Sequence, residues 1–224
     1  MRMSASVART AALAQFALLT ARVEALEPAQ LELPARLEPW RVLELVAHVT
    51  RNIGAVAPAV ARPEPAARTV ELAGYYDVAA RAAAAVKQRA IDDARSPVSW
   101  SAELATAVQA AAQALEGVPD TRLVTVRMGA VSLGDFLVTR CVEGAVHGID
   151  LARALDAEPA AWVDPAAAVV CAQHLAQRGV RHGITAAVQD RVVLIGDTVI
   201  PILDYIEWSS GRGPAVAGFP PLRL

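Results

Sequence analysis

A glutamate and a histidine stand four residues apart in the apolar run TRCVEGAVHGIDLARA, residues 139–154. On a helix this spacing places Glu143 and His147 on one face, with their Cβ atoms roughly 5 to 6 Å apart. A carboxylate and an imidazole are ligands that zinc accepts, but two ligands cannot complete its coordination. The best third candidate is His48, far upstream in PWRVLELVAHVTRN, on a second predicted helix. The sequence therefore predicts a divalent-metal site formed by these three side chains.

The same residues also have an interpretation without chemistry. Both histidines could be core side chains bonded to backbone carbonyls, and Glu143 could pair with Arg140 or Arg51, because the E-x-x-x-H spacing often occurs by chance. Spacing alone leaves both interpretations open.

Three polar side chains lie within one helical turn of a proposed ligand. Asp150, three residues after the second histidine, could accept the outer N–H of that imidazole, as metal-binding histidines usually require, or could form an ion pair with Arg153 or Arg51. Arg140, three residues before the glutamate, could orient that carboxylate or face solvent. Asn52 follows the first histidine by four residues and shares its helix face. These three residues are predicted to surround the ligands.

Composition limits the classes of function. The 224 residues are 54% hydrophobic and 4% aromatic, which is typical of a helix-rich globular protein. A formal net charge of −2 gives nucleic acid little to bind. Cys141 and Cys171 form no paired motif, which favours a reducing cytoplasm, and no apolar run is long enough to span a bilayer. Arg9 and Gln15 interrupt the first apolar run, so we expect a core helix there rather than a secretory signal.

Apolar periodicity and helix-stop residues divide the chain into elements. Ser132 and Asp135 resemble a capping box that starts the helix carrying the glutamate and the second histidine. The residues from 121 to 131 alternate in polarity over a few positions and predict a short strand or an extended entry segment. After Pro159 we expect a helix from Pro165, one strand in RVVLIGD, a short helix in ILDYIEWSSGRG and a terminal loop. The predicted helices before this region cover residues 4–26, 40–56, 70–93, 99–117 and 132–155.

The segments PWRVLELVAHV and GAVSLGDFLVTRCVEGAVHGIDLARAL together resemble the mycothiol-dependent maleylpyruvate isomerase family. The likeness is strongest over residues 38–52 and 128–156, and the order of elements agrees through about residue 157. It implies a mainly α fold, with a DinB-like up-down four-helix bundle over 1–157 and a small mixed α/β region over 158–224. In that family a histidine of the second bundle helix and an E-x-x-x-H pair of the last one bind zinc, at positions that correspond here to His48, Glu143 and His147.

The resemblance also implies a function. Two neutral imidazoles and a carboxylate leave a divalent ion with net positive charge and, for zinc, an open fourth position, where a bound thiol is deprotonated. The thiol would be mycothiol, the low-molecular-weight thiol of actinobacteria, acting on a small unsaturated acid by cis-trans isomerisation or thiol transfer. A metal-dependent hydrolase with a metal-bound water and a non-enzymatic metal-binding module remain alternatives. The cofactors are Zn²⁺ or another divalent metal and mycothiol, the partners are small molecules, and a monomer and a homodimer are both open.

The C-terminal region is expected to be shorter than the larger α/β domain of isomerase-type family members, which leaves the substrate open. Arg212, in the family-like ending YIEWSSGRG, could bind a substrate or mycothiol carboxylate with its guanidinium fork, or could simply lie near the end of a helix. His174 and His182 are eight residues apart without a third partner, and we expect both to be solvated.

Overall fold

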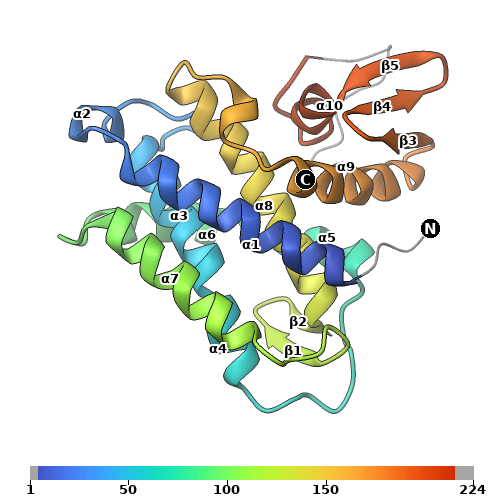
Figure 1. Ribbon diagram of the computed structural model, residues 1–224, viewed down its shortest axis with the longest axis horizontal. Helices are drawn as coiled ribbons and strands as arrows, with labels where there is room; N and C mark the ends of the chain where they lie inside the picture. Colours follow the sequence, from blue (N-terminus) through green and yellow to red (C-terminus); the bar gives the residue numbers. More distant parts are fainter. Residues whose placement is uncertain (1–4, 215–224) are drawn as a thin grey trace.

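The computed structural model describes residues 5–214 and places four long helices in a bundle. Helix α1 (Ala5–Glu24) contacts α8 (Leu133–Ala154) and α7 (Trp100–Leu115), and α3 (Val42–Gly54) contacts the same two helices. Each of the four helices therefore has two bundle neighbours, which closes a ring around one core (Figure 1). The predicted mainly α fold with a four-helix bundle is confirmed.

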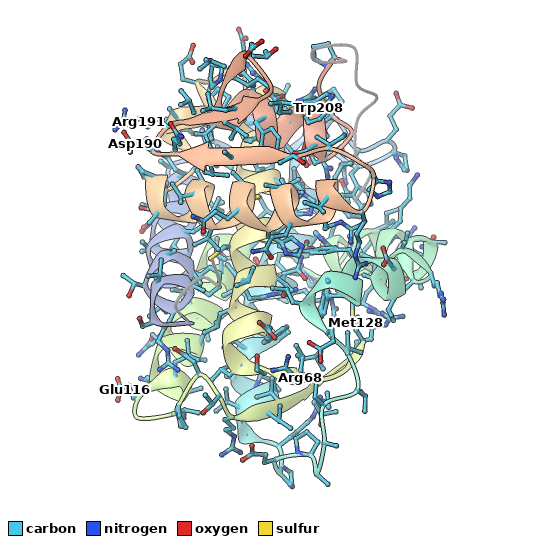
Figure 2. All side chains as sticks on the ribbon, turned by 90° about the vertical axis from the view of Figure 1, so that its right-hand side faces the viewer. Arg68, Glu116, Met128, Asp190, Arg191 and Trp208 are labelled. Atoms are coloured by element: carbon cyan, nitrogen blue, oxygen red, sulfur yellow. The ribbon has the colours of Figure 1, made fainter. Side chains whose placement is uncertain are left out.

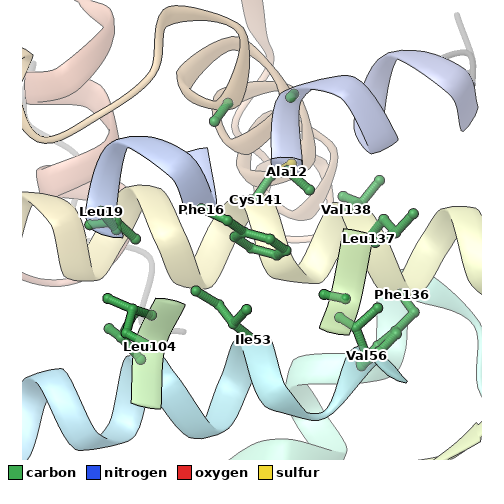
Figure 3. Packing of buried hydrophobic residues seen from close by; sticks show 14 of the residues in the cluster. Ala12, Phe16, Leu19, Ile53, Val56, Leu104, Phe136, Leu137, Val138 and Cys141 are labelled. Carbon is green, nitrogen blue, oxygen red and sulfur yellow. The ribbon is translucent and has the colours of Figure 1, made fainter. Parts of the chain in front are cut away.

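The core of the bundle consists of aliphatic and aromatic side chains from all four helices. Phe16 lies between α1 and α8 near Cys141, Leu104 reaches in from α7, and Phe136 packs beside Val56 (Figure 3). Removing a side chain of this size from water contributes about 1.5–3 kcal/mol. The packed side chains hold α3 against α8, the two helices that carry the proposed ligands.

Helix α8 is the most enclosed element, since 18 of its 22 residues are buried. The hydroxyl of Ser132 accepts a hydrogen bond from the backbone N–H of Asp135 at 3.2 Å, so the predicted N-terminal cap is formed. Neighbouring segments approach the helix closely at two glycines. A Cβ at Gly144 would lie 2.6 Å from Gln15 Cγ, and one at Gly148 would lie 2.5 Å from the carbonyl oxygen of Trp162.

The connection between α3 and α7 differs from the sequence prediction. The expected helix over 70–93 is broken into η1 (Leu72–Gly74), α5 (Tyr75–Ala80) and α6 (Ala83–Ala94), and the short α4 (Val56–Ala61) directly follows α3. A further short helix, α2 (Pro28–Leu31), lies between α1 and α3. The break lets Tyr75 and Tyr76 turn into the interior, whereas the alanines that follow have little apolar area to bury in a continuous helix.

The segment 121–131, predicted as a short strand or an extended entry segment, is a hairpin. Strands β1 (Leu123–Val126) and β2 (Gly129–Ser132) pair antiparallel, from Leu123 opposite Ser132 to Val126 opposite Gly129. Arg127 and Met128 form the two-residue turn, and Gly129 has a φ of +131°, a conformation that favours glycine.

The C-terminal region has three strands where the sequence predicted one. Helix α9 (Pro165–Val180) starts at Asp164, whose carboxylate accepts from two backbone N–H groups. Strands β3 (Ala186–Gln189), β4 (Val192–Ile195) and β5 (Thr198–Pro201) then form an antiparallel sheet in chain order, which lies over α9 with Asp190 and Arg191 at one turn (Figure 2). Strands β3 and β5 were missed because each has four residues, too few for alternation to stand out.

Helix α10 (Ile202–Ser209) and α9 complete a second apolar cluster, to which α8 also contributes. The short η2 (Pro159–Ala161) links α8 to α9. The proposed domain boundary near residue 157 stays a prediction, and most of the predicted terminal loop, residues 215–224, lies outside the described residues. Among the helices of residues 5–214, none combines the length and apolarity that crossing a bilayer requires.

Candidate metal centre

The three proposed ligands, separated in sequence, converge between α3 and α8. Glu143 Oε2 lies 3.4 Å from His147 Nε2 and 3.6 Å from His48 Nε2. One ligand atom from each residue lies within 4.8 Å of the other two. The imidazole rings are 4.9 Å apart and nearly perpendicular, at 89°, so they do not stack on each other.

These distances fit the donor set of a tetrahedral ion. Zinc bonds to nitrogen and oxygen are about 2.0–2.1 Å long, so two ligand atoms of a tetrahedron are separated by about 3.3–3.4 Å. The separations from Glu143 to His147 and His48, 3.4 and 3.6 Å, are close to this value. The cluster can therefore hold a divalent ion after a small inward movement of His48, and one tetrahedral position would stay open.

A buried carboxylate orients His147 through the ring nitrogen that does not face Glu143. Its Nδ1–H donates to Asp150 Oδ2 at 3.0 Å, which leaves the lone pair of Nε2 directed toward Glu143. Asp150 is fully buried and also accepts from Arg212 Nε at 2.8 and 2.9 Å. The contact predicted from the spacing of Asp150 is present, and Arg153 pairs with Glu207 instead.

His48 and Glu143 share a hydrogen-bond donor. Asn52 Nδ2 donates to His48 Nε2 at 2.9 Å and to Glu143 Oε2 at 3.1 Å. The amide orientation follows from Arg140, whose Nη1 donates to Asn52 Oδ1 at 3.0 Å. Arg140 therefore reaches Glu143 through Asn52, and among the described residues it forms no direct ion pair with that carboxylate.

Burial and charge set opposite directions for the pKa values of the two histidines. Burial lowers the pKa of His48, and its contact with Glu143 offsets this only in part. For His147 burial also lowers the pKa, but the hydrogen bond to Asp150 and the close contact with Glu143 outweigh it, and the net shift is upward. Burial raises the pKa of Glu143, yet its close contacts with both imidazoles and the charge of Arg140 hold it well below its usual range. Glu143 is therefore an anion at neutral pH.

The cluster opens into a cavity with two arms. The larger arm has a volume of about 520 Å³ and the smaller one about 220 Å³. Glu143, His147 and Arg212 line the smaller arm. The residues that line both arms, and so mark their junction, are His48, Asn52, Tyr75, Val86, Met128 and Arg140.

The seven residues that the sequence analysis proposed as ligands, as their neighbours or as a substrate-binding group all lie at this site. Arg212, the proposed substrate-binding group, donates hydrogen bonds to Asp150. Sequence reasoning missed Tyr75, Tyr76 and Met128, which line the cavity from the broken helix segment and the hairpin turn. No spacing rule connects them to the ligands, because they reach the site only through the tertiary fold. Met128, in the hairpin turn, is labelled in Figure 2.

The other reactive side chains lie elsewhere. The Sγ of Cys141 is buried and donates to the carbonyl oxygen of Ala8, and burial raises the pKa of this thiol to about 12. His174 is 1% exposed, so the prediction that it is solvated is wrong, whereas His182 is exposed. Burial, together with the charges of Arg178 and Arg181, lowers the pKa of His174 to about 4.

Comparison with known proteins places this geometry in a family. The sequence matches the family described as mycothiol maleylpyruvate isomerase N-terminal domain over residues 12–152, more than half of the chain. No curated protein matches the sequence significantly.

A solved structure described as the crystal structure of the mycothiol-dependent maleylpyruvate isomerase is similar with a TM-score of 0.63 and 16% identity, covering 94% of this chain and 90% of that chain. The likeness extends through most of that protein's length, so the expectation of a shortened C-terminal region is wrong in comparison with it. The match over residues 12–152 also includes all three residues of the candidate centre, and the chain belongs to the mycothiol maleylpyruvate isomerase N-terminal domain family.

Proposed function

We propose that this protein binds a divalent metal, zinc or a similar ion, through His48, Glu143 and His147, and uses it to activate mycothiol against a small electrophile. The observation that carries the proposal is the convergence of three ligand atoms, all within 4.8 Å of one another, at one side of a two-armed cavity. An ion held there would supply an open coordination position and lower the pKa of a thiol bound to it.

The residues around the ligands have separate tasks in this proposal. Asp150 keeps His147 in the tautomer whose Nε2 can bind a cation. Asn52 fixes His48 and Glu143 relative to each other through the hydrogen bonds from its Nδ2. When a cation binds to these two ligands, it replaces part of this hydrogen bonding. Arg212 Nε holds Asp150 and Nη1 donates to the carbonyl oxygen of Ser210, which leaves Nη2 for a ligand carboxylate in the smaller arm.

The two arms of the cavity suit the two reactants of the proposed reaction, the thiol and the electrophile. The sulfur of the thiol forms a bond to one carbon of an electron-poor double bond, and the electron pair of that double bond moves toward the adjacent carbonyl oxygen. Rotation about the new single bond, return of the electron pair and departure of the thiolate give the isomer. Protonation of the neighbouring carbon instead gives a thioether, the product of an S-transferase.

The first experiment measures bound metal in the purified protein and in His48→Ala. We expect close to one divalent ion per chain in the wild type and a large loss in the variant. His182→Ala, a change at an exposed histidine outside the cluster, is the control and should keep the metal. Equal metal content in wild type and His48→Ala would refute the proposed ligand set.

The second experiment incubates the metal-loaded protein with mycothiol and maleate and analyses the products by mass spectrometry and chromatography. A mycothiol adduct indicates thiol transfer, and fumarate formed only in the presence of the thiol indicates isomerisation. Turnover of an ester without thiol would instead favour the hydrolase, and a metal-loaded protein inert in both assays would favour the binding module.

A further inference from the structure

Arg140 presents one unused guanidinium nitrogen to the cavity. The side chain is nearly buried, at 4% exposure, and two of its nitrogens are committed: Nε donates to Thr139 Oγ1, and Nη1 donates to the carbonyl oxygen and to Oδ1 of Asn52. Within residues 5–214, Nη2 has no hydrogen-bond partner, and it is not among the polar atoms sealed inside the protein. Since Arg140 lines both arms, this nitrogen is a fixed donor directed at their contents.

Tyr75 presents a second unused donor at the same junction. It is 2% exposed and lines both arms, and its hydroxyl forms no hydrogen bond with any described residue. Its neighbour Tyr76 differs, because its hydroxyl donates to the carbonyl oxygen of Thr139 at 3.2 Å. Buried hydroxyl groups normally find a partner, so an open phenol in a cavity indicates a ligand that accepts a hydrogen bond there.

The wall of the larger arm adds a charge preference. Arg51 pairs with Asp93 there, but no carboxylate of the described residues lies within ion-pairing distance of the other arginines of the arm. Such a wall attracts anions along the approach to the site. The charged residues that line it are Arg51, Arg62, Arg89, Arg127, Arg140 and Asp93.

We propose that Arg140 Nη2 and Tyr75 Oη together bind a carboxylate or carbonyl oxygen of an anionic electrophile, next to its double bond. This inference rests on the proposed function for its chemistry. When the sulfur bonds to the far carbon of the double bond, the displaced electron pair places negative charge on that oxygen. Both donors then strengthen, since they face the atom where charge develops and need no reorganisation. When the electron pair returns and the thiolate departs, the charge disperses and the same donors release the product.

The first test measures binding without thiol, by titration calorimetry of the full-length, metal-loaded protein with maleate and with dimethyl maleate. We expect maleate, the anion, to bind more tightly than the neutral diester. Tyr75→Phe, which removes a hydroxyl that bonds to nothing in the protein, should weaken maleate binding about tenfold or more, because hydrogen bonds to charged groups have that strength. Arg140→Gln should do the same, and both variants should weaken diester binding less.

Tyr205→Phe is the matched control. Tyr205 is fully buried, and its hydroxyl is also unpartnered within the described residues, but it lines neither arm of the cavity. This variant should bind maleate as the wild type does. Melting temperature and metal content are measured for every variant, and if Arg140→Gln fails to fold, Tyr75→Phe alone decides. If Tyr75→Phe is folded and metal-loaded and its affinity for maleate is within twofold of that of the wild type, the proposal is overturned.

The second test separates this inference from the proposed function. With mycothiol present, Tyr75→Phe should lower kcat at least as much as it raises KM, because the oxygen it binds gains charge in the transition state. A wild type that binds maleate through both donors but never forms an adduct or isomer would refute the thiol chemistry and leave the anion site standing. A wild type that turns over, with Tyr75→Phe unchanged in both kcat and KM, would refute the anion site alone.

Discussion

Replacing Asp150 by asparagine should weaken metal binding without any change to a metal ligand. The carboxylate of Asp150 accepts from His147 Nδ1–H and twice from Arg212 Nε, and no water reaches it because the residue is fully buried. An asparagine of the same shape has one acceptor oxygen and one NH₂ donor in place of two acceptors. Whichever way the amide turns, its NH₂ faces either the imidazole or the guanidinium.

The guanidinium of Arg212 can only donate, and its Nε lies 2.8 and 2.9 Å from the two oxygens of Asp150, so it loses an acceptor in either orientation. The neutral amide also accepts from His147 Nδ1–H more weakly than a carboxylate does, so the tautomer with its Nε2 lone pair directed toward Glu143 is held less firmly. Changes at the partners of metal-binding histidines typically cost about 10–100-fold in metal affinity. We expect a loss in this range for Asp150→Asn.

The measurement is a competitive titration of zinc between the protein and a chelator at pH 7.5. Asp120→Asn is the control, since Asp120 is ion-paired with Arg9 and largely buried but lies far from the site. Asp150→Asn also removes the negative charge beside Arg212, so both variants need unfolding curves, and the titration is run well below their melting temperatures. Zinc affinity of Asp150→Asn within twofold of wild type would refute the assignment of Nε2 of His147 as a ligand atom.

Two further predictions concern stability. The pKa of His174 is about 4 in the folded chain, against its ordinary value of 6.5 in the unfolded chain. The contribution of this residue to the free energy of unfolding is therefore constant above pH 6.5 and is lost as the pH falls toward 4. At pH 5 the loss is about 2 kcal/mol. Urea unfolding at pH 7.5 and pH 5 should therefore show a smaller loss for His174→Leu than for wild type, and an unchanged loss for His182→Leu. Gly148→Ala should destabilise the protein by at least about 1–3 kcal/mol, because the new Cβ meets the carbonyl of Trp162. Gly54→Ala, where the nearest atom is 3.7 Å away, should be neutral or stabilising; similar effects of the two alanines would contradict this packing argument.

The part of the site that lies on one helix could be predicted from the sequence. Helical geometry alone brings Glu143, His147 and Asp150 together, because three- and four-residue spacings place side chains on one face. His48 was different. Nothing in its own segment points to the other helix, so the sequence offered it only as the best third candidate, and the family resemblance supported that choice. The fold places its Nε2 3.6 Å from Glu143 Oε2.

The contributions of the connecting segments could not be predicted. Tyr75 follows a 3₁₀ turn and Met128 lies in a hairpin turn, and their approach to the site depends on long-range packing rather than on local periodicity. Local periodicity was also insufficient for helix α8. Its apolar residues surround it on all sides, as expected for a central helix, so periodicity could not distinguish the face toward the cavity from the faces toward α1 and α9.

Charge balance links the proposed metal to the proposed anionic electrophile. With neutral imidazoles, the buried charges of Glu143 and Asp150 are balanced by those of Arg140 and Arg212, which also lie near the ligands. A divalent cation adds two positive charges beside largely buried side chains, and uncompensated charge is costly there. The thiolate returns one negative charge and a carboxylate of the electrophile the other, so the site is neutral only when both reactants are present. Each reactant should therefore bind more tightly after the metal, and the metal should be held more tightly by the same factor when they are bound.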